Sequence, residues 1–254
     1  MIYDIQPASI LKRISAFILD IILLATIAVG IAYLVSIILK VDNHQQVLQD
    51  KYTYYEETYN VKFNLTQEEI DALSEEEKAH YEEVEDIIQH DEELIKEYNL
   101  VINLTLITIV LGVLFAVLIL EFVIPLIFKN GQTIGKKIFS IIVAKSNSVK
   151  ISNVQLFVRT IFGKFLIELM IPIYIIVAMF FGTAGRFWVF FLIGLTLLQM
   201  ILLVATKNHT VIHDAISFCV VCDKQTQKLF ASEDELIKYK EKVHSEEVAK
   251  THTY

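Results

Sequence analysis

Residues 11–39 read LKRISAFILDIILLATIAVGIAYLVSIIL, and this stretch decides the class of fold. From Ile14 to Leu39 it is largely apolar and carries only one charge, Asp20. About 20 apolar residues are enough for a helix to cross the hydrocarbon core of a bilayer. A carboxylate at that depth costs roughly 2.5–3.5 kcal/mol on insertion scales. Other parts of the chain must therefore compensate for Asp20.

The whole chain has the composition of a membrane protein. It has 254 residues, is 54% hydrophobic and has a mean hydropathy of +0.51. No small-residue cleavage site follows the first apolar stretch, so we expect it to be retained rather than removed as a signal peptide. Four transmembrane helices are predicted, at about 14–39, 99–128, 161–181 and 187–206.

Charge is segregated along the sequence. Positions 40–99 hold 18 acidic residues and 5 lysines, whereas positions 129–167 hold 7 basic residues and no acidic one. Basic loops stay in the cytoplasm, so we expect a cell (plasma) membrane protein with both termini cytoplasmic. Cys219 and Cys222 would then lie on the reducing side, where a structural disulfide is not expected.

The predicted fold class is an all-α membrane protein with four transmembrane helices, an extracellular acidic helical insert and a small cytoplasmic β-element. The predicted parts are the N-terminus and first span (1–40), the acidic insert (41–98), the other three spans (99–206) with a cytoplasmic loop (129–160), and a β-segment with a charged tail (207–254).

Two helix starts are predicted inside the acidic insert. Thr66 with Glu69, and Ser74 with Glu77, have the spacing of a capping box. No Gly or Pro occurs between positions 75 and 111, which predicts one continuous helix running into the second span.

The basic loop predicts short elements. Residues 132–139 indicate an amphipathic turn at the membrane surface, and 141–144 with 149–151 indicate a β-hairpin. The β-rich stretch 217–222 is expected to join them in one small sheet. Ser152 is placed to cap the helix that enters the third span.

Three carboxylates fall inside predicted spans, at Asp20, Glu121 and Glu168. Each is six or seven residues from the inner end of its span, or about 9–11 Å at 1.5 Å per residue. The topology therefore predicts all three at one level. Pro125 and Pro172, each four residues after a glutamate, free carbonyls that can line a cavity.

Basic side chains lie near the same level. Arg13 is two helical turns from Asp20 on the same face, and Lys164 precedes Glu168 by four residues, as an ion pair on one helix requires. Such a network has two interpretations: an ion path or proton relay, or a set of pairs that fixes helix register. The lone CxxC, and a histidine pair at 209 and 213, do not amount to a metal site, so no metal or cofactor is expected.

Three motifs, in this order, resemble the RDD family of prokaryotic membrane proteins: Arg13-x-x-Ala16-x-x-x-Asp20, Gln132-Thr133-Ile134-Gly135-Lys136 and His213-Asp214. The family is named for one arginine and two aspartates, which the resemblance maps onto Arg13, Asp20 and Asp214. Arg159 falls where members often carry another arginine. Ala215 departs from the family pattern, which commonly has a basic residue there. The resemblance implies transport of an unidentified ligand, and a few relatives are associated with sodium/proton antiport.

Together these features predict that Arg13 pairs with Asp214, or bridges Asp214 and Asp20. The predicted charge network consists of Arg13, Asp20, Glu121, Arg159, Lys164, Glu168, His213 and Asp214.

Two functions remain open at this point. One is cation- or proton-coupled transport, with the bilayer, a small ion and a second copy of the chain as partners. The other is a membrane accessory protein whose acidic insert and cytoplasmic segments bind partners. Nucleic acid is not an expected partner. No span carries HExxH or GxSxG, so an enzyme is not expected.

Overall fold

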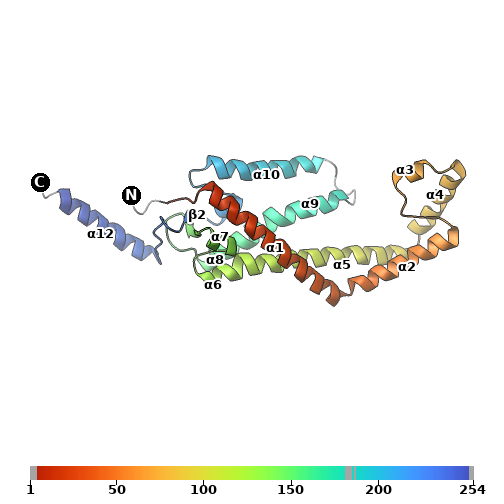
Figure 1. Ribbon diagram of the computed structural model, residues 1–254, viewed down its shortest axis with the longest axis horizontal. Coiled ribbons are helices and arrows are strands. Elements are labelled where there is room, and N and C mark those ends of the chain that lie inside the picture. Colours follow the sequence, from red (N-terminus) through yellow and green to blue (C-terminus); the bar gives the residue numbers. More distant parts are fainter. Residues whose placement is uncertain (1–4, 181–184, 186, 252–254) are drawn as a thin grey trace. The chain divides into compact units, whose positions relative to one another are not determined.

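The computed structural model describes residues 5–180, 185 and 187–251 (Figure 1). Its elements in chain order are α1 (Ile10–Leu39), α2 (Val41–Tyr59), α3 (Gln67–Asp71), α4 (Glu75–Gln89), α5 (Glu92–Val117), the π-helix η1 (Leu118–Val123), α6 (Ile124–Phe128), α7 (Ile134–Ile138), β1 (Ile141–Lys145), α8 (Asn153–Val158), the π-helix η2 (Arg159–Met170), α9 (Ile171–Phe180), α10 (Phe187–Ala205), α11 (Ile212–Ile216), β2 (Cys219–Asp223) and α12 (Glu233–Thr251).

Four helices in this described part are long and apolar enough to cross a membrane, at Ile10–Leu39, Glu92–Phe128, Asn153–Met179 and Phe187–Ala205. The prediction of an all-α membrane protein with four spans and a small β-element is confirmed. The chain divides into two compact units, residues 1–27 with 114–254, and residues 28–113. Each is described by itself.

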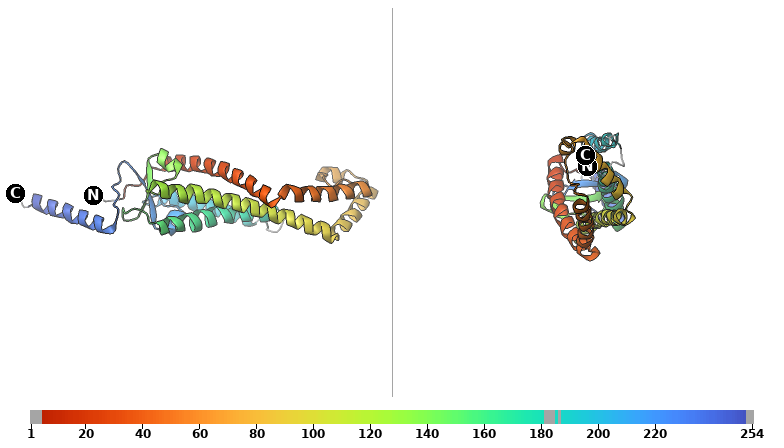
Figure 2. Two further views of the ribbon diagram at one scale, coloured as in Figure 1. Left: turned by 90° about the horizontal axis from the view of Figure 1, so that it is seen from below. Right: turned by 90° about the vertical axis from the view of Figure 1, so that its right-hand side faces the viewer.

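The first unit holds the sheet at one end of its long helices, together with α7, α8 and α11 (Figures 1 and 2). β1 and β2 pair antiparallel, from Ile141 opposite Asp223 to Lys145 opposite Cys219. The small sheet predicted to join the basic loop to the segment after the last span is therefore present.

The predicted hairpin within the loop is reduced to a single antiparallel bridge, between Ala144 and Lys150. A tight turn diverts the chain here, because Ser148 adopts a left-handed conformation with φ of 66°. Its N–H donates to Lys145, and the Lys150 N–H then donates to the carbonyl of Phe230 at 2.9 Å. The Val143 N–H, which would donate to Ile151 if the hairpin continued, donates instead to the carbonyl of Asn130 at 3.3 Å.

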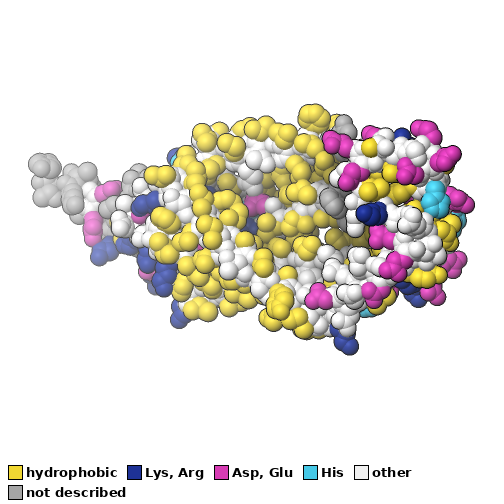
Figure 3. Space-filling view, turned by 45° about the vertical axis from the view of Figure 1, so that its right-hand side comes forward, with side chains coloured by type: hydrophobic (Ala, Val, Ile, Leu, Met, Phe, Trp, Pro, Cys, Tyr) yellow, Lys and Arg dark blue, Asp and Glu magenta, His cyan; other side chains and the backbone are white. Residues whose placement is uncertain are grey.

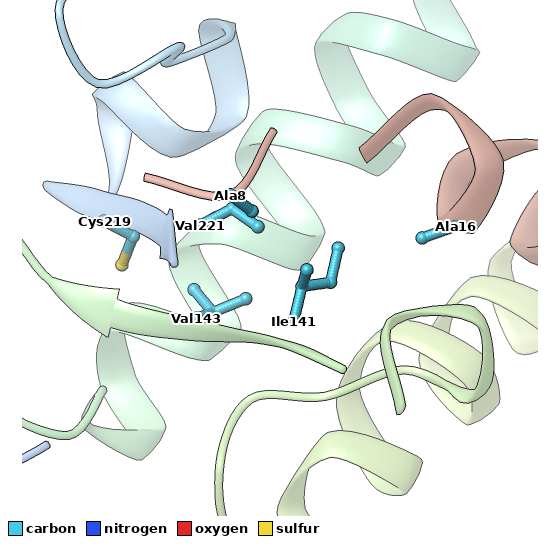
Figure 4. Packing of buried hydrophobic residues seen from close by; sticks show 6 residues of the cluster. All are labelled: Ala8, Ala16, Ile141, Val143, Cys219 and Val221. Atoms are coloured by element: carbon cyan, nitrogen blue, oxygen red, sulfur yellow. The ribbon is translucent and has the colours of Figure 1, made fainter. Parts of the chain in front are cut away.

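Alternate residues of the strands enter two separate cores. On one face the buried cluster consists of Ala8, Ala16, Ile141, Val143, Cys219 and Val221 (Figure 4). On the other face it consists of Ile142, Ala144, Val220 and Cys222. The two thiols therefore lie on opposite faces and do not converge.

The second unit packs tyrosines and a phenylalanine around Val84, Ile88 and Leu94. Both predicted capping boxes are present, at Thr66 and at Ser74.

The prediction of a continuous helix from 75 to 111 is wrong, because α4 ends at Gln89 and α5 begins at Glu92. Asp91 causes the break without Gly or Pro. Its Oδ1 accepts hydrogen bonds from the N–H groups of Glu93 at 2.9 Å and Leu94 at 3.2 Å, which starts a new helix.

Candidate functional site

Asp20 is held by the loop segment after the second span. The Gly135 N–H donates to its Oδ1 at 2.8 Å, and the Thr133 hydroxyl donates to its Oδ2 at 2.5 Å. The Lys136 ammonium lies 3.8 Å from the same Oδ2. Both carboxylate oxygens are thus satisfied, which explains how a charged residue is accommodated in α1.

This arrangement requires a glycine at position 135. A Cβ there would lie 2.4 Å from the carbonyl oxygen of Ala16 and 2.8 Å from Asp20 Oδ1. Only a residue without a side chain allows α7 to approach α1 closely enough for the backbone N–H to reach the carboxylate. The predicted short turn is present as α7, with Ile138 exposed, but Thr133, Gly135 and Lys136 are buried against α1.

Asp214 joins two arginines from distant parts of the chain. Its Oδ2 accepts from Arg13 Nη2 at 2.9 Å, and its Oδ1 accepts from Arg159 Nε at 2.9 Å. The predicted contact between Arg13 and Asp214 is present. Burial alone would raise the pKa of Asp214, but the neighbouring His213 and the guanidinium charges of Arg159 and Arg13 outweigh burial and hold this pKa well below its usual range.

The other version of that prediction, in which Arg13 also bridges to Asp20, is not what the structure shows. The basic residue beside Asp20 is Lys136. Arg13 points its bonded nitrogen toward Asp214, and its Nη1 is buried without a hydrogen-bond partner among the described residues.

Glu121 lies on η1 and faces three cations. Lys164 donates to its Oε1, while Lys136 and Arg159 each lie 3.7 Å from its Oε2. The predicted pairing of Lys164 with Glu168 is not observed. Instead the ammonium of Lys164 reaches across from η2 to η1.

The backbone around Glu121 is adapted to a proline. Pro125 lacks the N–H that an α-helix would donate to the Glu121 carbonyl. The hydroxyl of Thr160 on η2 donates to that oxygen at 2.9 Å. A polar side chain thus satisfies the carbonyl that the proline frees, and the same bond ties the two helices together.

Glu168 forms the other end of the network. Its oxygens lie 2.7 and 2.9 Å from His213 Nδ1, and Gln199 Nε2 donates to Oε1 at 2.5 Å. The second nitrogen of His213 lies 3.4 Å from Asp214 Oδ1. Burial lowers the pKa of His213 below its ordinary value, even though both carboxylates oppose this shift.

Close packing positions the histidine. A Cβ at Gly163 would lie 2.5 Å from the Cβ of His213, so glycine allows α11 to rest directly on η2. Since ionised Glu168 is only an acceptor, the Nδ1 of His213 is the protonated nitrogen in this contact.

Contacts of 3.8 Å or less thus form an unbroken chain, which runs through Glu168, His213, Asp214, Arg159, Glu121, Lys136 and Asp20. Its four carboxylates are matched by four cationic side chains when His213 is neutral. The cations are Arg13, Lys136, Arg159 and Lys164.

Seven of the eight residues named from the sequence line one cavity of about 460 Å³. The eighth, Asp214, lies behind the wall and holds Arg13 and Arg159. The network predicted from the sequence lacks Lys136, Thr133 and Gln199, which the structure places in the site. Lys136 and Thr133 belong to the motif at 132–136, whose pattern indicates a turn at the membrane surface. The polar Gln199 in an otherwise apolar span is a usable signal of a polar site.

Fold and site together define a multi-pass membrane protein with a charge-balanced network around a cavity at one end of its spans. The comparison with protein families identifies which class of such proteins this is. The chain belongs to the RDD family, whose model matches residues 7–217. Comparisons with curated proteins and with solved structures find no match.

Proposed function

We propose that this RDD-family protein is a transporter coupled to a small cation or a proton, and that the charge network forms its site. The observation that carries the proposal is the cavity of about 460 Å³, whose lining includes Asp20, Glu121 and Glu168. Ionisable side chains inside spans are costly and mark ion paths or proton relays in membrane proteins. We propose no enzymatic reaction for the network.

The proposal includes an orientation and an assembly. The basic loop at 129–160 would lie in the cytoplasm with both termini, and the acidic insert outside the cell membrane. Four spans make a small pathway, so a homo-oligomer would complete it.

Neutralising the carboxylates tests the proposal. Everted vesicles would carry the wild-type chain, Asp20→Asn, Glu121→Gln or, as a matched control, Glu246→Gln on α12. We expect ion-driven uptake or antiport to be lost in the first two variants and kept in the control. Thermal unfolding of each purified variant would show that the loss is not a failure to fold. Full activity in both Asp20→Asn and Glu121→Gln would refute the proposal.

A second candidate function is that of an accessory protein that binds partners through its acidic insert. It is favoured by the separate core that the insert forms around Val84, Ile88 and Leu94, remote in sequence from the charge network. Deleting residues 50–90 discriminates between the two. Unchanged transport with a lost partner would favour the accessory role, and unchanged partner binding would count against it.

A further inference from the structure

The cavity has a polar floor and apolar walls. Its floor is the charge network, and most of its apolar walls come from α1 and α10. The wall residues of these two helices are Ile14, Phe17, Ile21, Leu24, Leu195, Met200 and Leu203. A purely ionic ligand would not need such walls, and a purely apolar ligand would leave the charged floor without a partner.

The protein does not close the cavity between these walls. Phe17 on α1 is 56% exposed and Met200 on α10 is 59% exposed, although both line the cavity. No residue of α10 is buried in the part of the chain that the structure describes. Figure 3 shows a hollow in the apolar surface, coloured yellow, with an acidic side chain visible inside it. In a bilayer the medium on this side is lipid.

Two opposite charges are the most accessible parts of the floor. Side-chain exposure is 18% for Glu168 and 13% for Lys164, against 4% for Glu121 and 1% for Arg159. Both residues also keep bonding capacity. The ammonium of Lys164 has three donors, and Glu121 takes one of them. The Oε1 of Glu168 already accepts from Gln199 and His213, whereas its Oε2 accepts only from His213 Nδ1 and keeps a further acceptor position.

We propose that this cavity binds a phospholipid with a primary ammonium headgroup, of the phosphatidylethanolamine class. Its phosphate is bound by Lys164, its ammonium by Glu168, and one acyl chain lies between α1 and α10. A zwitterionic headgroup leaves the balanced charge of the network unchanged. The binding is independent of ion coupling, because it requires no gradient and no transport step.

Headgroup chemistry gives the test. A primary ammonium donates hydrogen bonds to a carboxylate, whereas the trimethylammonium of phosphatidylcholine has no N–H, and phosphatidylglycerol has no cation. Delipidated protein would be mixed with equal amounts of the three lipids with identical acyl chains, and bound lipid counted by native mass spectrometry. We expect about a tenfold preference for phosphatidylethanolamine, the size of one charge-assisted hydrogen bond.

Substitutions test the charged floor and the apolar wall of the cavity separately. Glu168→Gln should abolish the headgroup preference. Met200→Trp should reduce binding of phosphatidylethanolamine by filling the cavity. Ile201→Trp, a neighbour that is equally exposed at 59% but does not line the cavity, should leave binding unchanged. Soluble phosphoethanolamine should not compete at the same concentration, since it lacks the acyl chain.

Equal binding of the three lipids would show annular lipid only and overturn the proposal. So would a preference for phosphatidylglycerol, a preference that survives both Glu168→Gln and Met200→Trp, or full competition by soluble phosphoethanolamine. Loss of ion-driven transport with an intact lipid preference, or the reverse, would separate this inference from the proposed function.

Discussion

Asp214 accepts a hydrogen bond at 2.9 Å from Arg13, a residue 201 positions earlier in the chain, and an equally short one from Arg159. The carboxylate therefore fixes the start of α1 and the start of η2 to α11 by two charge-assisted bonds. Such bonds are roughly twice as strong as those between neutral groups. Removing the carboxylate would leave two buried guanidinium groups facing each other.

The first prediction concerns this carboxylate. Asp214→Asn should destabilise the protein by about 3–5 kcal/mol, the usual cost of breaking a buried ion pair by removing one partner. Thermal unfolding of the purified protein in one detergent measures the change. Asp234→Asn, at an exposed position on α12, is the matched control and should leave the unfolding temperature unchanged. Equal unfolding temperatures for the two variants would contradict the described role of Asp214.

The second prediction uses the close approach at Gly135. Gly135→Ala would place a Cβ 2.4 Å from the backbone oxygen of Ala16, so α7 must move away from α1 and the N–H must leave Asp20. We expect a loss of several kcal/mol in stability, since overpacking and an unsatisfied carboxylate act together. Gly194→Ala on α10 meets nothing within 4 Å and gains helix propensity, so it should be neutral or slightly stabilising. If Gly135→Ala were also neutral, the contact between α7 and α1 would be wrong.

These two sites show what could be predicted from the sequence. The spans and the pairing of Arg13 with Asp214 follow from hydropathy and the motif order. The partner of Asp20 cannot be predicted in this way, because a Lys in a basic loop is normally exposed and nothing local indicates that Lys136 is buried. It becomes buried through the glycine at 135, whose effect depends on which helix packs against it.

The helix break at Asp91 was missed for a related reason. Helix propensity and the absence of Gly and Pro favoured a continuous helix from 75 to 111, but a single Asp side chain caps two N–H groups of the next helix. Its other oxygen accepts from the hydroxyl of Tyr55 at 2.8 Å, a partner 36 residues earlier. The two capping bonds are local, so an Asp followed by two glutamates is a usable signal of a helix start, whereas the tyrosine that supports the cap is not visible in the local sequence.

The third prediction concerns pH and Lys136. Burial lowers the pKa of Lys136 from the ordinary 10.5 to about 8, while the neighbouring Glu121 opposes this shift. Between pH 8 and 10.5 the unfolded chain then binds more protons at this position than the folded one. Stability should therefore rise with pH across this window, by up to about 3 kcal/mol from this group.

The matched variant is Lys136→Arg, which stays charged throughout that window. Unfolding temperatures at pH 7.5, 8.5 and 9.5 would be compared for the two proteins. The difference in favour of the wild type should increase with pH. A difference that is constant or decreases would mean that Lys136 is not the buried titrating group.

The fourth prediction tests the bond between Thr160 and the Glu121 carbonyl. Thr160→Val keeps the shape of the side chain but leaves that buried carbonyl without its hydroxyl donor, which should cost about 1–3 kcal/mol. Thr26→Val is the control, since the Thr26 hydroxyl donates to a carbonyl of its own helix and is exposed. In a Pro125→Ala background the restored backbone N–H can serve the carbonyl, so Thr160→Val should cost less there. An unchanged cost would show that the proline does not create the need for Thr160.

The last prediction concerns the two cysteines, which lie on opposite faces of the small sheet. Cys219 is 1% exposed and Cys222 is 0% exposed. Burial raises the pKa of Cys219, and it raises the pKa of Cys222 to about 12. Since the thiolate is the reactive form, neither thiol should react with a maleimide at pH 7 in the folded protein, and both should react after denaturation. Mass spectrometry of the labelled chain measures this. Asn147→Cys, placed in the exposed turn beside β1, supplies an accessible thiol as the positive control. Labelling of Cys219 or Cys222 at a rate near that of the control would mean that the sheet opens in solution. The support that β2 gives to Asp214 through α11 would then be lost.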